Sequence, residues 1–145
     1  MSRIIRTENI GTERTRLLKA IVIAIRELMR QTSVDSTTKD LAAFISGALL
    51  AVHHTVERSV IPWEKRDYWV KADKFRMEWA WTKEIGDQFL QATIDQEWPT
   101  VALLSAEVGK KLQKVVVSDR HRMGKPWVGA WDLLLQERSN PDQNS

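Results

Sequence analysis

The sequence predicts an all-α protein, a compact bundle of four main helices followed by a short C-terminal helix. Apolar residues recur at spacings of three and four over most of the chain, which is the period of an amphipathic helix. Strand signals are poor, because the best β-branched run, Val115 to Val117, continues a helical pattern. The chain is 43% hydrophobic and 28% charged, close to globular averages, so a folded body is expected.

At 145 residues, the length fits one domain. We expect a single helical domain over 1–145, with an N-terminal arm (1–11), a helical body (12–136) and a disordered polar tail (137–145).

The longest apolar run, Leu41 to Val52, has 12 residues, whereas a bilayer span needs roughly 20, so no membrane is expected. No signal peptide is recognisable at the start, and a cytoplasmic protein is therefore expected. The absence of cysteine excludes disulfides, zinc–thiolate sites and cysteine nucleophiles.

The first helix is predicted from Thr12, a good N-cap residue, to about Gln31. Its apolar side chains fall within an arc of about 140° at 100° per residue, which indicates a core-facing stripe. The stripe contains Leu17, Leu18, Ile21, Val22, Ile25, Leu28 and Met29. Lys19, Arg26 and Arg30 stand on the opposite side.

The second helix is predicted to begin at Thr37, because Asp40 follows three residues later in a weak capping box. It should end before Pro62, since proline disfavours helix in the residue before it. Its apolar residues lie nearly all round the axis, so this helix should be the most buried.

Pro62 is then expected to open a third helix, where its missing amide is no disadvantage. Nothing from Trp63 to Glu97 forbids a helix of about 35 residues, and a break near Gly86 is the alternative.

A fourth helix should follow Pro99, with one apolar stripe through Val101, Leu104, Val108, Leu112 and Val115. A basic connection over 118–126 and a last helix over 127–136 complete the chain.

Six of the eleven aromatic residues lie between Trp63 and Trp81, interleaved with nine charges. Projected on one helix, this stretch has two apolar lines on opposite sides. The core line is Tyr68, Ala72, Phe75 and Trp79, and the second line is Trp63, Val70, Met77 and Trp81. Because such side chains left exposed forgo roughly 1.5–3 kcal/mol each, we expect the second line to be covered.

Two coverings of this second line are open. Within the chain, it could be covered by the C-terminal helix with Trp127 and Trp131, or by the N-terminal arm with Ile4 and Ile5. Alternatively, a second copy or a distinct protein partner covers it, because exposed aromatic and methionine patches favour recognition. The stretch is a poor platform for stacking bases, since its charges are five basic and four acidic.

Residues that carry chemistry are sparse. His53 and Glu57 share a helical side, but no Glu-x-x-His motif of a di-iron bundle occurs. The glycines are isolated and form no phosphate-binding loop, and no nucleophile-elbow sequence is present. We therefore predict no enzyme activity, no cofactor and no metal site.

Positive charge is concentrated in two segments. Residues 1–30 carry seven basic and three acidic side chains, and residues 99–126 carry six and two, each a net charge of +4. If these segments converged on one surface, they would form a binding surface for the phosphate backbone of a nucleic acid. The candidate residues are Lys19, Arg26, Arg30, Lys110, Lys111, Lys114, Arg120, Arg122 and Lys125.

The sequence thus predicts a non-catalytic helical adaptor or oligomeric subunit. It would associate with a copy of itself or with another protein through Trp63, Val70, Met77 and Trp81. The alternative is a small nucleic-acid-binding protein that uses basic residues of 1–30 and 110–125.

Overall fold

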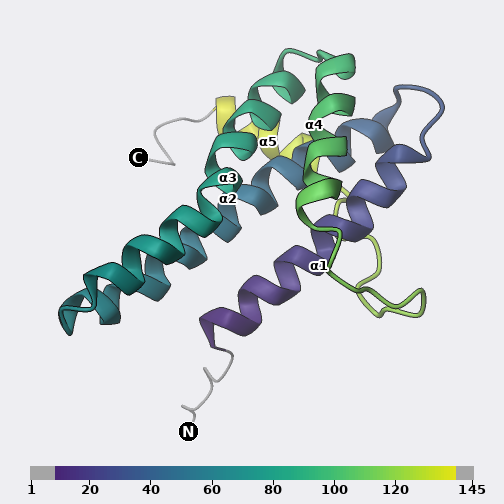
Figure 1. Cartoon of the computed structure of the whole chain (residues 1–145). Helices are drawn as coiled ribbons and strands as arrows, with labels where there is room; N and C mark the ends of the chain where they lie inside the picture. Colours follow the sequence, from purple (N-terminus) through teal and green to yellow (C-terminus); the bar gives the residue numbers. More distant parts are fainter. Residues whose placement is uncertain (1–8, 140–145) are drawn as a thin grey trace, which may run out of the picture.

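A computed structural model describes residues 9–139, which form helices and no strand (Figure 1). The elements are α1 (Ile10–Met29), α2 (Ser36–Lys65), α3 (Trp69–Ile94), α4 (Trp98–Lys111) and α5 (Ala130–Ser139). The predicted all-α architecture is confirmed, with four long helices packed together and a short C-terminal helix. No helix among the described residues is both long and apolar enough to cross a membrane.

The first helix starts two residues earlier than predicted. The side chain of Asn9 accepts a hydrogen bond from the Thr12 amide at 2.7 Å, so Asn9 is the cap and Thr12 lies inside the first turn. Ile10 and Gly11, expected in the arm, are therefore helical, and at the other end residues 137–139 belong to α5 rather than to the tail. Residues 1–8 and 140–145 lie outside the described part of the chain.

The second helix is capped by Asp35, not by Thr37. Asp35 accepts from the Thr38 amide at 3.1 Å, and the Thr38 hydroxyl lies 3.4 Å from the Asp35 amide, which completes a capping box. Asp40, the expected partner in the box, has another role. Its carboxylate accepts from the backbone amides of Gly129 and Trp131, at 3.1 and 2.9 Å, and so holds the start of α5 against α2.

The prediction that α2 ends before Pro62 is wrong. The helix continues through Pro62 to Lys65, although an interior proline costs about 3 kcal/mol. The residues after the proline make contacts that offset this cost, because the Trp63 ring meets Phe75 and the Glu64 carboxylate pairs with Arg76. The chain reverses instead at residues 66–68, where Asp67 takes a left-handed conformation with φ of 63°.

The third helix accordingly begins at Trp69 rather than at Pro62. It runs through Gly86 without a break. Gly86 permits close packing, because a Cβ placed there would lie 2.9 Å from Leu50 Cδ2 on α2. The stripe predicted for α4 is confirmed through Val101, Leu104 and Val108, all of which are buried.

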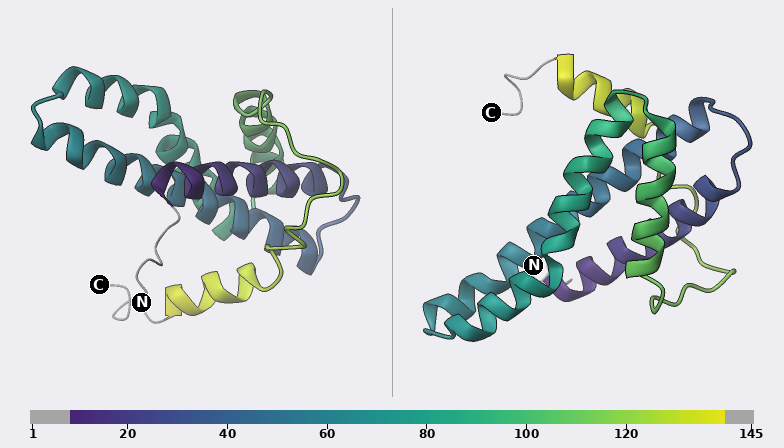
Figure 2. Two further views of the ribbon diagram at one scale, coloured as in Figure 1. Left: turned by 90° about the horizontal axis from the view of Figure 1, so that it is seen from below. Right: turned by 45° about the horizontal axis from the view of Figure 1, so that its top comes forward.

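The core forms around α2, which contacts α1, α3 and α5, while α4 packs on α3 and α1. Side chains from all four long helices contribute, together with Trp127 from the segment before α5. The end of the α2–α3 hairpin extends beyond the other helices in every view (Figures 1 and 2).

Arg14 of α1 marks the base of this projection. Its guanidinium donates to the Thr55 hydroxyl and carbonyl, at 3.0 and 3.2 Å, and to Ser59 Oγ at 2.5 Å. It also lies over the Phe75 ring, 4.9 Å from the centroid, so that one side chain ties α1 to both helices of the hairpin. Burial, with the charge of Arg58 as a smaller cause, lowers the pKa of Arg14.

Candidate functional site

The predicted interface residues do not lie on one helix. Because the chain reverses at residues 66–68, Trp63 belongs to α2, whereas Val70, Met77 and Trp81 belong to α3. The Trp63 ring meets Phe75 of α3 edge to face, with centroids 5.2 Å apart, and Lys71 Nζ lies 4.4 Å from the Trp63 centroid. Trp63 therefore helps to close the hairpin rather than extending a face of α3.

Within the described residues of one chain, the second apolar line is only partly covered. Val70 is 68% exposed and Met77 is 77% exposed. Trp81 is half-buried and stacks on Trp79, with centroids 6.4 Å apart. Tyr68, predicted to face the core, is exposed next to the turn, while Ala72 of the same line is buried as expected.

The C-terminal helix does not cover the exposed residues. Trp127 is buried in the core, and Trp131 lies against α2 with its ring 5.8 Å from Lys39 Nζ. The other expected cover, Ile4 and Ile5 of the arm, lies outside the described residues.

One exposed residue was missed by the helical projection. Trp69 is 52% exposed and begins α3 directly after the turn. At 100° per residue, Trp69, Val70, Met77 and Trp81 fall within an arc of about 120° on α3, and we call this set the α3 outer face. Trp81, at one edge of the arc, also packs against the core. The signal that could have revealed it is the Arg66-Asp67 pair, since aspartate tolerates the left-handed conformation that ends a helix.

A shallow hollow of about 400 Å³ adjoins this face at Val70. Trp63 and Phe75 line its apolar part, and Lys71, Lys74 and Glu78 supply charges of both signs. On the side of the hairpin where the two helices meet, Arg76 bonds Glu64 at 2.5 Å and Glu57 at 3.2 Å. These hydrogen bonds, the one to Glu64 first, raise the pKa of Arg76.

The histidine pair lies beside Glu57 on α2. Glu57 pairs with Arg76, and the rings of His53 and His54 lie tilted with centroids 5.7 Å apart. Within residues 9–139, no three histidine, aspartate or glutamate side chains gather as metal ligands.

The nine basic residues singled out in the sequence are all exposed. The two segments that carry them lie against each other, because three hollows are lined both by α1 and by residues of 108–127. Arg26 and Arg30 share a cavity of about 330 Å³ with Lys125, and Lys19 shares one of about 410 Å³ with Ser118 and His121. Lys19, Arg26, Arg30 and Lys125 line these hollows, and we call these four residues the basic face. The other five, Lys110, Lys111, Lys114, Arg120 and Arg122, line none of the three hollows.

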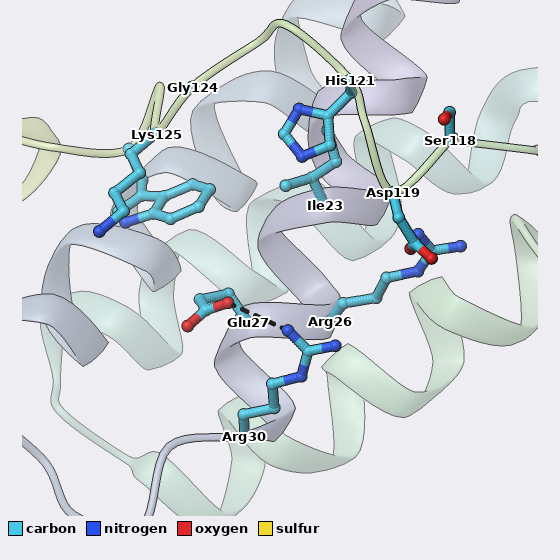
Figure 3. A pocket seen from close by; sticks show the side chains of 10 residues that line it. Ile23, Arg26, Glu27, Arg30, Ser118, Asp119, His121, Gly124 and Lys125 are labelled. Atoms are coloured by element: carbon cyan, nitrogen blue, oxygen red, sulfur yellow. Dashed lines mark hydrogen bonds and ion pairs between the residues drawn. The ribbon is translucent and has the colours of Figure 1, made fainter.

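Lys110 and Lys114 do not line the third hollow. A hollow of about 190 Å³ brings Gly109 and Gln113, their sequence neighbours, against Arg26. Figure 3 shows the first cavity, where His121 and Lys125 of the connecting segment face Arg26, Glu27 and Arg30 of α1. Glu27 accepts from Arg30 at 3.5 Å between exposed groups, a weak contact that leaves the face basic.

Comparison with known proteins gives no family for this chain. No family model matches it, and no curated protein or solved structure shows significant similarity to it.

Proposed function

We propose that this protein is a non-catalytic helical subunit of the cytoplasm that associates with a second copy of itself through the α3 outer face. The observation that carries the proposal is the exposure of Trp69, Val70 and Met77 on one side of a projecting helical hairpin. A distinct protein partner would use the same side chains.

Burial of these exposed side chains in an interface would be energetically favourable. Burying side chains of this size contributes roughly 1.5–3 kcal/mol each. The hairpin is already held by Arg76 and by the Trp63–Phe75 contact, so association would not have to order it. Exposed tryptophan and methionine are also the residue types enriched in protein interfaces.

The first test measures molecular mass by light scattering over a range of concentrations. We expect a wild-type mass above that of the monomer, and a monomer with unchanged helicity for the double variant Val70→Glu, Met77→Glu. The matched control, Leu103→Glu with Val116→Glu, places two charges at equally exposed apolar sites elsewhere and should keep the wild-type mass. A strictly monomeric wild type would contradict self-association.

Nucleic-acid binding is a second candidate, favoured by the contact between the two basic segments. Cations that neutralise backbone phosphates release counterions, so the affinity for a duplex should fall steeply with salt. Replacing Lys110 and Lys114 by methionine should reduce the slope of log K against log salt by about one per residue removed. Binding of duplex DNA that is weak and independent of salt would rule this candidate out.

A further inference from the structure

The cavity between α1 and the segment before α5 has the size of a small-ligand site. Its volume of about 330 Å³ lies at the lower end of the range of about 300–1,000 Å³ that such sites occupy. Arg26 and Arg30 come from α1, whereas His121, Lys125 and Trp127 come from residues about 100 positions later.

Two cations in the cavity have no partner in the described part of the chain. Neither Arg26 nor Lys125 makes a hydrogen bond or ion pair to any residue of 9–139. Among the described residues, Arg30 has only the 3.5 Å contact to Glu27, which is exposed to solvent. Three cationic side chains therefore have donors available to a bound group.

Two neutral side chains add donors. His121 Nδ1 accepts from the Met123 amide at 3.2 Å, so the neutral ring carries its proton on Nε2, where it can donate. Ser118 Oγ accepts from the Arg120 amide at 3.1 Å, which leaves the hydroxyl proton of Ser118 to donate elsewhere.

The decisive residue is Trp127. It lines the cavity and is only 5% exposed, yet its indole N–H has no acceptor among residues 9–139. Buried indole N–H groups normally find a partner, because an unpaired buried donor costs stability. An oxygen of a bound ligand would complete this hydrogen bond.

The acidic residues of the cavity further limit which class of ligand fits it. Glu27 and Asp119 also line it, so three cations face two carboxylates. A bare anion would meet both attraction and repulsion, whereas a molecule that carries an anionic group and also hydroxyl or amino donors could satisfy both sets.

We infer that this cavity binds a small phosphate monoester bearing hydroxyl or amino groups, such as a mononucleotide or a sugar phosphate. The phosphate accepts from Arg26, Lys125 and the Trp127 indole, and the rest of the molecule donates to Asp119 and Glu27. The inference does not depend on self-association through the α3 outer face.

The test follows the Trp127 indole N–H signal in ¹H–¹⁵N spectra of the full chain, with Trp127→Phe identifying the signal and calorimetry as an independent measure. We expect saturable shifts with adenosine 5′-monophosphate or ribose 5-phosphate, weaker binding of inorganic phosphate and none of adenosine. The monoester that binds more tightly shows whether the preferred ligand is a nucleotide or a sugar phosphate. A Trp127 signal unmoved by both, or inorganic phosphate binding as tightly as either ester, would overturn the inference.

A charge-matched pair of variants separates this site from general attraction to basic side chains. Arg26→Met with Lys125→Met removes two exposed cations of the cavity and should weaken monoester binding about tenfold or more. Lys110→Met with Lys114→Met removes the same charge outside the cavity and should weaken it less than about threefold, because salt screens those charges. Equal losses in both pairs would contradict a built site, whereas duplex binding should respond to both pairs if the second candidate function is correct.

Discussion

The α3 outer face and the basic face assemble in different ways. The outer face comes from consecutive turns of one helix, and its orientation depends on where the chain reverses, at Asp67 rather than at Pro62. The basic face joins α1 to residues about 100 positions later, and no local rule brings them together. A face built on one helix can thus be assigned wrongly when a single turn is misplaced. A face built from segments far apart in the chain depends instead on the packing that holds those segments together.

The sharpest test of this comparison pairs a buried tryptophan with an exposed one. Trp127→Ala leaves a cavity beneath the basic face and should lower the free energy of unfolding by about 3–5 kcal/mol. Trp69→Ala on the outer face should change it by no more than about 0.5 kcal/mol. Denaturant unfolding measures both values, and similar losses would contradict the burial of Trp127.

The second prediction concerns the position of the reversal. Pro62 lies on the exposed side inside α2, so Pro62→Ala restores a backbone donor and removes a clash with the preceding turn. We expect the free energy of unfolding to rise by about 1–3 kcal/mol in the same assay. A lower value would indicate that the helix ends at Pro62, as the sequence alone suggested.

The smallest effect is expected at the attachment of the last helix. Asp40→Ala removes the acceptor of the Gly129 and Trp131 amides and should cost about 1 kcal/mol, with faster amide exchange at the start of α5. The control is Asp73→Ala, which replaces an exposed aspartate of α3 that has no partner among residues 9–139. It should leave the free energy of unfolding nearly unchanged. Unchanged exchange in Asp40→Ala would show that the core packing of Trp127 holds the segment without this cap.

Much of the architecture could be predicted because it depends on local periodicity. The stripe through Val101, Leu104 and Val108 identifies α4 and its buried side without knowledge of its neighbours. The stripe of α1 similarly places Leu18, Ile21 and Ile25 in the core. Spacing along one helix fixes which side chains share a side, whatever that side packs against.

The candidate sites could be predicted only in part. The basic residues were identified from their charge. The buried indole N–H of Trp127, which lacks an acceptor among residues 9–139, was not identified, because the burial of one indole depends on contacts with α1. Trp69 was missed because a single helix was drawn through the turn at residues 66–68.

By itself, the sequence determined the helical class, the apolar stripes and the two basic segments, since these follow from residue type and spacing. Only the tertiary structure decided that α2 continues through Pro62, because Trp63 and Glu64 beyond the proline contact Phe75 and Arg76 of α3, and these contacts offset the local cost of proline. It also decided that the basic segments meet, because the distance between residues far apart in the chain is set by how the helices pack and not by their own sequences.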